Sequence, residues 1–379
     1  MLAALGHPER HYPTLHIGGT NGKGSTCAFL AAELAARGLK AGLYTSPHLV
    51  SPCERIVVDG SAISADAFAE WTARLRPVIE RTEASFFEAV TAIAFADFAA
   101  RGADVAIVEV GLGGRLDATN VITPLVSAVT KVAREHTDYL GSDPAGIARE
   151  KAGIAKRDVP FVTGEPDPAL RAVLVATARS LGAHPIRVVA DHGPGTGRLG
   201  LRGAHQWHNA RVALGVLNEL PAALGGPAGS AVPPSFADAF LAGRFDVRGS
   251  WIFDVAHNPD GMGVLVATLE EAQPARPLKA LVGIRGDKEW RAMLEVLLPA
   301  LEGCVLTAPP SVPAGQQWPL ADVRAWAAGR PGGAAVEVEP DFDRALVRAR
   351  AGAATTLVTG SFHTVGDVLG RLPGFAPLG

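Results

Sequence analysis

The sequence predicts an α/β fold in two domains, each a mostly parallel sheet flanked by helices, with the second domain smaller and Rossmann-like. Short β-rich runs alternate with helical patterns for most of the length, which is typical of βαβ units. The chain has 379 residues, more than one hydrophobic core usually serves. Its 48% hydrophobic content with only 6% aromatic residues indicates a core rich in alanine, glycine and valine.

The first series of elements opens with a strand over Thr14–Gly18 and a helix over Ser25–Arg37, which Gly38 ends. The later elements of this series are the strands Ala41–Thr45, Asp104–Val110, Leu125–Val132 and Val159–Thr163 and the helices Ala65–Arg81, Phe86–Ala100 and Ala145–Lys156. The composition then loosens. His192–Gly203 is rich in glycine, and Pro221–Ser235 is predicted to be a flexible connection without periodicity.

A second alternating series follows this connection. Its predicted strands, with helices between them, are Ser250–Val255, Leu278–Ile284, Gly303–Ala308, Ala334–Val338 and Thr355–Ser361. We place the domain boundary near Gly243–Asp246, so that the two domains comprise residues 1–243 and 244–379.

Charge and cysteine usage exclude several classes of protein. A net charge of -3 and a pI near 6.4 give no electrostatic basis for binding nucleic acid. The three cysteines are far apart and odd in number, which indicates free thiols in a reducing compartment. No signal-peptide pattern opens the sequence, and the most apolar helix is too short and too polar to span a bilayer. We expect a cytoplasmic monomer without nucleic-acid or membrane partners.

The stretch HIGGTNGKGSTC resembles a phosphate-binding loop in an unusual register. The common P-loop reads G-x-x-x-x-G-K-[ST], and its hydroxyl binds magnesium. Here three residues separate Gly18 from Gly22, and Gly24 takes the place of the hydroxyl after Lys23. Glycines let backbone N–H groups approach phosphate, and the dipole of the following helix favours the same anion. The first domain is therefore predicted to be a P-loop domain that holds a nucleoside triphosphate through residues 20–25, with Lys23 on the β- and γ-phosphates.

Polar residues follow four of the predicted strands at the carboxyl end, where open α/β sheets bind ligands. Lys23 follows the first strand, Ser46 and His48 the second, Glu109 ends the third and His136 follows the fourth. Ser46 is the candidate for the missing hydroxyl, and with Glu109 it offers the oxygen ligands that magnesium prefers. A histidine ligand would also suit manganese.

Each of these residues also has a structural explanation. A lone lysine after glycine, or a serine before proline, often belongs to a turn, and His136 with Asp138 could cap a helix. Glu109 is harder to explain in this way, because a carboxylate that ends an apolar strand is costly to bury unless it is paired or bound to metal. Together, at matching strand ends, the four positions favour a functional site.

At this point the motifs resemble those of a known family. HIGGTNGKGST, TSPHL with ERIVVDG, IVEVGLGGRLDATNVI, EHTDYLG, REKAGI, HQWHNA and DVAHNP occur in this order. This pattern resembles the folylpolyglutamate synthase and dihydrofolate synthase family, a branch of the Mur ligase superfamily. The resemblance implies an ATP-dependent ligase that joins L-glutamate to a pteroate or folate carboxylate through an acyl phosphate. Its substrates would be dihydropteroate or a reduced folate, L-glutamate and ATP.

The resemblance also implies roles for individual residues. Ser46, Glu109 and His136 match magnesium ligands, and Lys151 matches a carbamylated lysine that would help to hold a second magnesium. His257 matches a histidine near the reacting phosphate, so Lys23, Lys151 and His257 are the expected catalytic residues. The expected ATP-binding residues are Thr20, Asn21, Gly22, Lys23, Gly24, Ser25, Asn209, Arg244 and Asp254. The expected acceptor-binding residues are Phe86, Phe87, Glu88, Asp117 and Ala118, among which Asp117 can pair with the N–H donors of a pterin.

Other functions remain as alternatives. Another amide ligase of the superfamily, acting on a UDP-muramoyl peptide, would need a whole domain before the phosphate loop. A regulatory GTPase would need an N-K-x-D run, which the chain lacks. A catalytically impaired folate-binding protein would leave the expected metal ligands idle. The sequence leaves open whether the chain is a dihydrofolate synthase, a folylpolyglutamate synthase or both.

Overall fold

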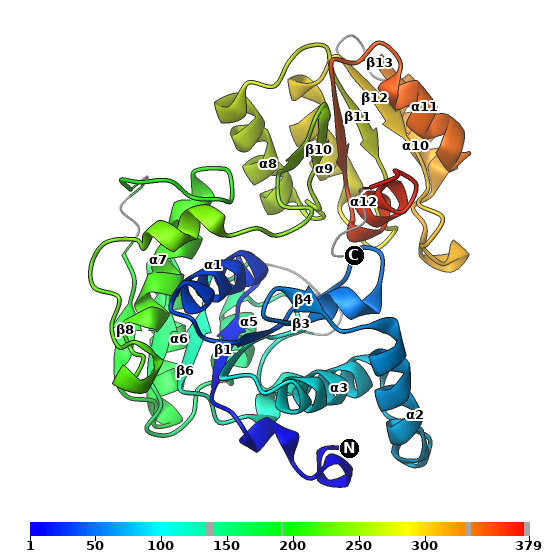
Figure 1. Ribbon diagram of the computed structural model, residues 1–379. Coiled ribbons are helices and arrows are strands. Elements are labelled where there is room, and N and C mark those ends of the chain that lie inside the picture. Colours follow the sequence, from blue (N-terminus) through cyan, green and yellow to red (C-terminus); the bar gives the residue numbers. More distant parts are fainter. Residues whose placement is uncertain (134–139, 191–192, 194, 330–334, 375–379) are drawn as a thin grey trace. The chain divides into compact units, whose positions relative to one another are not determined.

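The computed structural model describes residues 1–133, 140–190, 193, 195–329 and 335–374. The chain divides into two compact units. Among the described residues, the first unit comprises Met1–Gly200 and Ala204–Phe240, and the second comprises Leu201–Gly203 and the chain from Leu241 to Gly374. Each unit contains a mostly parallel sheet flanked by helices (Figure 1), which confirms the predicted fold class.

The first unit is built on an eight-stranded sheet in the order β4-β3-β2-β5-β1-β6-β7-β8. Its strands are β1 (Thr14–Gly18), β2 (Ala41–Tyr44), β3 (Ile56–Val58), β4 (Ser61–Ala62), β5 (Val105–Glu109), β6 (Val126–Val129), β7 (Phe161–Thr163) and β8 (Ile186–Val188). Six neighbouring strands pair in parallel, in the order β2-β5-β1-β6-β7-β8. The other two, β3 and β4, form an antiparallel edge that the sequence pattern did not predict. Strand β1 therefore lies at the centre, between β5 and β6.

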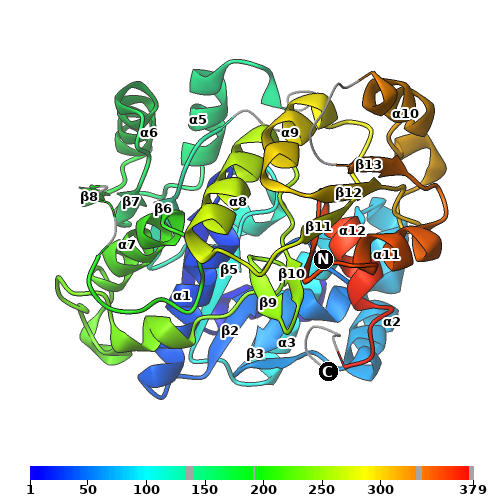
Figure 2. The same cartoon turned by 90° about the horizontal axis from the view of Figure 1, so that it is seen from above.

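The helices of this unit flank the sheet. They are α1 (Lys23–Ala36), α2 (Ala65–Thr82), α3 (Phe86–Ala100), α5 (Pro144–Ala152), α6 (Pro168–Ser180) and α7 (His205–Leu217). Helix α1 lies beside α7, and α5 lies beside α6 (Figures 1 and 2). Both α5 and α6 begin at an Asp-Pro pair, where the Asp143 and Asp167 side chains accept N–H groups of the first turn.

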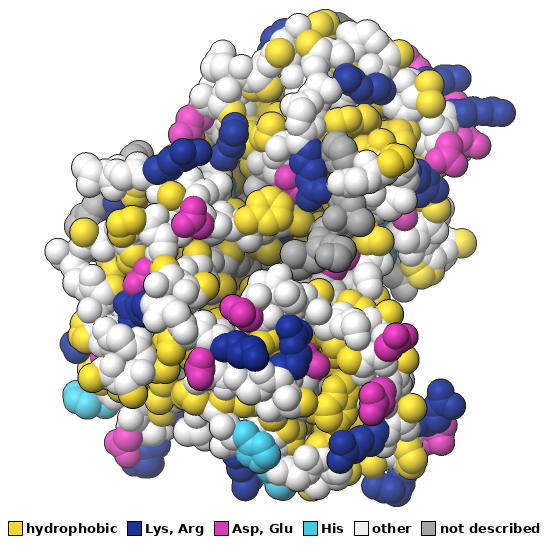
Figure 3. Space-filling view, viewed as in Figure 1, with side chains coloured by type: hydrophobic (Ala, Val, Ile, Leu, Met, Phe, Trp, Pro, Cys, Tyr) yellow, Lys and Arg dark blue, Asp and Glu magenta, His cyan; other side chains and the backbone are white. Residues whose placement is uncertain are grey.

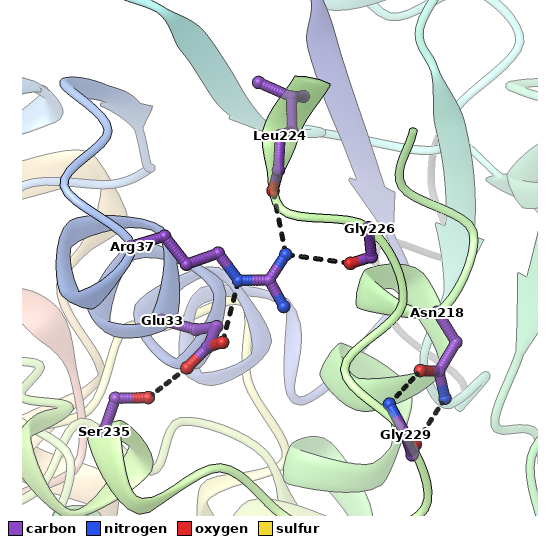
Figure 4. Close-up of polar contacts among 7 residues, drawn as sticks. All are labelled: Glu33, Arg37, Asn218, Leu224, Gly226, Gly229 and Ser235. Carbon is purple, nitrogen blue, oxygen red and sulfur yellow. Dashed lines mark hydrogen bonds and ion pairs between the residues drawn. The ribbon is translucent and has the colours of Figure 1, made fainter. Parts of the chain in front are cut away.

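Pro221–Ser235, which the sequence predicted to be a flexible connection, is held to the helices by polar contacts (Figure 4). The Arg37 guanidinium on α1 donates to the carbonyl oxygens of Leu224 at 2.8 Å and Gly226 at 3.0 Å. Further hydrogen bonds join Asn218 to both backbone groups of Gly229, and Ser235 to Glu33. Long-range polar contacts thus join to the helices a segment that lacks any periodic pattern of its own.

The second unit is built on a six-stranded sheet in the order β13-β12-β11-β14-β10-β9. Its strands are β9 (Asp246–Arg248), β10 (Trp251–Phe253), β11 (Leu278–Val282), β12 (Gly303–Leu306), β13 (Ala335–Val338) and β14 (Thr355–Thr359). Its helices are α8 (Pro259–Ala272), α9 (Trp290–Leu297), α10 (Leu320–Ala328), α11 (Phe342–Arg350) and α12 (Phe362–Leu369). These strands pair in parallel except β9 with β10, an antiparallel edge that was not predicted.

The distribution of charge on the surface agrees with the small net charge of -3. Lys and Arg side chains are interspersed with Asp and Glu over the face shown in Figure 3. All three cysteines are free, as predicted, and Cys27 and Cys304 are buried. Every helix among the described residues is too short or too polar to pass through a membrane.

Candidate active site

The predicted phosphate loop joins the central strand to the first helix. Strand β1 ends at Gly18, and α1 begins at Lys23 with Gly22 as its N-cap in the left-handed conformation, φ 91°. The loop is held from the neighbouring strand end, because Thr130 Oγ1 donates to the Asn21 carbonyl at 2.7 Å. The N-terminus of a fourteen-residue helix, with the N–H groups of its first turn, therefore lies at the carboxyl edge of the sheet.

Three further hydrogen bonds complete the loop. The Thr20 N–H donates to the carbonyl of Lys131 at 2.6 Å, and the Thr20 hydroxyl donates to the carbonyl of Ala133 at 3.0 Å. The Lys23 ammonium donates to the Thr20 carbonyl at 3.0 Å, across the loop. Ser25 is buried in the first turn of α1.

Asn209 of α7, which is predicted to bind ATP, packs directly against this loop. A Cβ atom at Gly22 would overlap the Asn209 side-chain oxygen, so only glycine fits there. Asn209 is itself oriented from both sides. Its amide donates to Gln206 Oε1 at 2.9 Å, and its backbone carbonyl accepts from the Thr26 hydroxyl at 3.5 Å.

We expect Gly22→Ala to weaken binding of a non-hydrolysable ATP analogue at least about tenfold, which corresponds to roughly 1.4 kcal/mol. Alanine is strained at a positive φ, and its Cβ would displace Asn209. Titration calorimetry measures the effect. Gly38→Ala is the matched control, because Gly38 also has a positive φ but its Cβ would meet no described atom within 4 Å. Equal affinities in both variants would contradict this account of the loop.

Glu109 and Ser46 lie together beside the loop. Glu109 is the last residue of β5, only 3% exposed, and pairs with Ile17 of β1. One of its carboxylate oxygens accepts the Ser46 N–H at 3.1 Å. Among the described residues, no three His, Cys, Asp or Glu side chains are arranged to hold a metal, and His136 lies outside them. The two residues nevertheless fit magnesium, which needs few protein oxygens because water and phosphate supply the rest.

Lys151 reaches the loop from α5. Its side chain is only 4% exposed, and Nζ donates to the Gly19 carbonyl at 2.9 Å. The cap of α5 at Asp143 sets the start of this helix, and the buried Ile147 and Ala148 pack its inner face. Lys151 thus lies at the phosphate loop although 132 residues separate it from Gly19 in the chain.

The residues that the family resemblance assigns to binding of the acceptor occupy two segments of the first unit. Phe87 packs beside Tyr44 with ring centroids 6.1 Å apart, whereas Phe86 is 57% exposed. Asp117 lies after β5 as the N-cap of a short 3-10 helix that begins at Ala118, and its nearly buried side chain accepts hydrogen bonds from Leu112 and Thr119.

Glu88 has a structural role that sequence reasoning missed. It completes a capping box with Ser85 at the start of α3, accepting the Ser85 N–H at 2.8 Å and the hydroxyl at 2.7 Å. These hydrogen bonds lower the pKa of the Glu88 carboxyl. The signal was present in the sequence as S-x-x-E before an apolar run.

We expect Glu88→Ala to lower the free energy of unfolding by roughly 1 kcal/mol, because α3 loses one side of its capping box. Glu88→Gln should retain most of this stability, since glutamine also completes such a box. Urea denaturation of the two variants measures the difference. A Glu88→Gln variant as unstable as Glu88→Ala would exclude the capping explanation.

Arg55 is a further buried residue here that sequence reasoning did not select. It is 8% exposed, donates from Nε to His48 Nδ1 at 2.9 Å, and has its guanidinium 5.5 Å from the centre of the Phe86 ring. Burial lowers its pKa. An arginine immediately before the apolar run IVV was the available signal.

The second unit carries the remaining three site residues near the carboxyl ends of β10 and β14. The Asp254 carboxylate accepts the N–H groups of Phe245 and Ala256, both at 2.9 Å. Burial raises its pKa, although the positive charge of Arg244 opposes the shift. His257 donates from Nδ1 to the Val255 carbonyl at 2.9 Å, because a carbonyl only accepts.

Phe362, at the start of α12, links two of these residues. The Arg244 guanidinium lies 5.1 Å from the centre of its ring, and the His257 ring lies 5.5 Å away on a tilted plane. The second unit therefore holds a cation and an imidazole around one aromatic side chain, and the positive charge of Arg244 acts on the Asp254 carboxylate.

Comparison with known proteins places these features in a family. Residues 243–362 match the model of the Mur ligase, glutamate ligase domain. The dihydrofolate synthase/folylpolyglutamate synthase of Mycobacterium tuberculosis is 36% identical over 355 residues, which cover 81% of this chain and 72% of that protein. The most similar solved structures include the folylpolyglutamate synthase of M. tuberculosis complexed with ADP, with a TM-score of 0.85, 32% identity and coverage of 99% and 93% of the two chains.

E. coli FolC in complex with DHPP and ADP is similar to nearly the same extent. Its TM-score is 0.82 and its identity 32%, over 97% of this chain and 90% of that one. These matches cover nearly the whole chain, whereas the phosphate-loop motif comprises only a short segment of it. The chain therefore belongs to the folylpolyglutamate synthase and dihydrofolate synthase family.

Proposed function

We propose that this protein ligates L-glutamate to the carboxylate of a pteroate or folate, using ATP and passing through an acyl phosphate. The observation that carries the proposal is the convergence of the N-terminus of α1, Lys23, Asn209, Glu109 and Lys151 on one loop of the first unit. Family membership supports the reaction, because the matched relatives are named for this activity.

The loop residues would bind and orient the triphosphate. The N–H groups at Gly22, Lys23, Gly24 and Ser25 have no helical partner preceding them and can donate to phosphate oxygens, with Thr20 and Asn21 shaping the turn. The Lys23 ammonium donates to the Thr20 carbonyl in this structure. When ATP binds, it would turn to the β- and γ-phosphates. We also propose ATP contacts for Asn209 in the first domain (1–243) and for Arg244 and Asp254 in the second (244–379).

We propose that Ser46, Glu109, His136 and Lys151 hold the metal, with Lys151 as its carbamate. Magnesium, or manganese in its place, would neutralise charge on the phosphates when bound. The buried carboxylate of Glu109 keeps its orientation through the Ser46 N–H. The short distance from Lys151 Nζ to the Gly19 carbonyl places the lysine end at the loop, where a carbamate would add oxygen ligands for a second ion.

The acceptor carboxylate would attack the γ-phosphorus and release ADP, and the amine of glutamate would then attack the acyl carbon and release phosphate. We propose that His257 lies near the reacting phosphate in the second domain. On the acceptor side we propose Phe86, Phe87, Glu88, Asp117 and Ala118. We propose that the protein works as a monomer in the cytoplasm, and the free thiols support a reducing compartment.

The test is release of ADP with magnesium and glutamate, comparing dihydropteroate, tetrahydrofolate and no acceptor. Turnover with dihydropteroate establishes a dihydrofolate synthase, which is bifunctional if tetrahydrofolate also serves. Turnover with tetrahydrofolate alone establishes a folylpolyglutamate synthase. ATP binding without turnover on either acceptor would overturn the proposal and favour another amide ligase or an inactive folate-binding protein.

A further inference from the structure

A buried chain of hydrogen bonds connects the central strand to the loop that carries Asp117. His16 of β1 and Thr119 are both fully buried, and His16 Nε2 lies 2.8 Å from the Thr119 hydroxyl. That hydroxyl lies 2.5 Å from Asp117 Oδ1, and the other carboxylate oxygen accepts the Leu112 N–H at 2.8 Å. His16 and Thr119 are 103 residues apart in the chain, so no local motif explains the contact.

The direction of each hydrogen bond follows from the chemistry of the groups. A carboxylate only accepts, so the single hydroxyl proton of Thr119 goes to Asp117. The Thr119 oxygen must then accept from His16, which puts the ring proton on Nε2. The other ring nitrogen, Nδ1, is buried and has no hydrogen-bond partner among the described residues. Burial, together with the charge of Lys156, lowers the pKa of His16 to about 3, so the ring is neutral at physiological pH.

This arrangement leaves the Asp117 side chain little freedom. Asp117 Oδ1 accepts two bonds from Thr119, one from the hydroxyl and one from the N–H at 3.0 Å. Asp117 Oδ2 accepts the N–H of Leu112, which precedes it in the same loop. The same loop is closely packed at its start, since a Cβ atom at Gly111 would overlap the ring of Phe87. Loss of the Thr119 hydroxyl would remove one of these three hydrogen bonds and leave the Asp117 side chain more freedom.

We propose that His16 and Thr119 are positioning residues for the acceptor, holding Asp117 in the orientation that recognises the ring N–H donors of the pterin. This inference rests on the proposed function, because it takes Asp117 as the residue that touches the acceptor. His16 and Thr119 act through Asp117 and are too deeply buried to meet the acceptor themselves. The expected signature is a loss of acceptor affinity without a loss of ATP affinity.

The decisive variant is Thr119→Val, which keeps the shape of the side chain and removes the hydroxyl. We expect the KM for the acceptor to rise roughly tenfold and the KM for ATP to change less than about twofold. Thr119→Ser is the matched control and should retain most of the acceptor affinity, because serine can make both hydrogen bonds. His16→Gln should retain more affinity than His16→Leu, since its amide nitrogen can take the place of Nε2. An unchanged acceptor KM in Thr119→Val, or equal rises in both KM values, would overturn the proposal.

A measurement on the unmodified protein tests the hydrogen-bond chain without relying on turnover. In protein labelled with 15N-histidine, we expect the His16 ring to be protonated at Nε2 only and not to titrate between about pH 5 and pH 9. The Nε2 signal should shift in Thr119→Val. A ring that titrates near its ordinary pKa of about 6.5, or carries its proton on Nδ1, would rule out the chain. If the ring behaves as expected but no acceptor supports ADP release, the failure belongs to the proposed function.

Discussion

Lys151→Ala is expected to lower the rate of ADP release by roughly two to three orders of magnitude while leaving the fold intact. The Lys151 side chain is buried and ends at the Gly19 carbonyl of the phosphate loop. Alanine can neither contact the loop nor form a carbamate. If the carbamate forms, a small carboxylate such as acetate should restore part of the rate, because it supplies the missing oxygen ligands. Steady-state ADP release with and without acetate is the measurement.

Two controls separate the carbamate from a simple charge effect. Lys151→Arg keeps the positive charge but cannot form a carbamate, so it should be as inactive as Lys151→Ala. Lys156→Ala removes a neighbouring lysine, which donates to the Asn120 carbonyl, and should retain much more activity. Labelling with 13C-bicarbonate should give a carbamate signal in the unmodified protein and none in Lys151→Ala. An active Lys151→Arg variant, or no labelled signal, would refute the carbamate.

Glu109→Gln is expected to raise the magnesium concentration for half-maximal turnover at least about tenfold and to lower the maximal rate. The substitution removes the negative charge, but its amide oxygen can still accept the Ser46 N–H, so the local structure should persist. ADP affinity measured without metal should change less than about twofold. Magnesium titrations of turnover, paired with calorimetry of ADP in a chelator, give both quantities.

The matched control for this variant is Glu339→Gln in the second unit. Glu339 is also a nearly buried carboxylate that follows a strand, and it pairs with Arg348 at 3.1 Å. The Glu339→Gln substitution should lower the free energy of unfolding without changing the magnesium concentration that turnover requires. Equal losses of turnover and of metal-free ADP binding in Glu109→Gln would show that Glu109 supports the loop rather than the metal.

The elements that carry the site were predictable because their signals are local. Strand β1 has the predicted bounds Thr14–Gly18, and Glu109 ends its strand as expected. Apolar β-rich runs followed by glycine or a polar residue mark the carboxyl ends of parallel strands, which meet at one edge of the sheet. Lys23 and Ser46 follow predicted parallel strands and Glu109 ends one, so their position along the chain was enough to predict that they lie at this edge.

Other features depend on partners that are remote in the sequence. The edge strands β3, β4 and β9 are too short to produce a period, and they exist because a neighbouring strand supplies their hydrogen bonds. The Pro221–Ser235 segment looked flexible because its anchors, Glu33 and Arg37, lie on α1.

The sequence by itself determined the fold class, the phosphate loop and the polar strand ends, because each depends on residues that are neighbours in the chain. Only the tertiary structure decided that Asn209 packs on Gly22, that Lys151 reaches Gly19, and that His16 is hydrogen-bonded to Thr119. These contacts join residues from different elements. Their geometry comes from the packing of α1, α5, α7 and β1, which no periodicity in a single segment records.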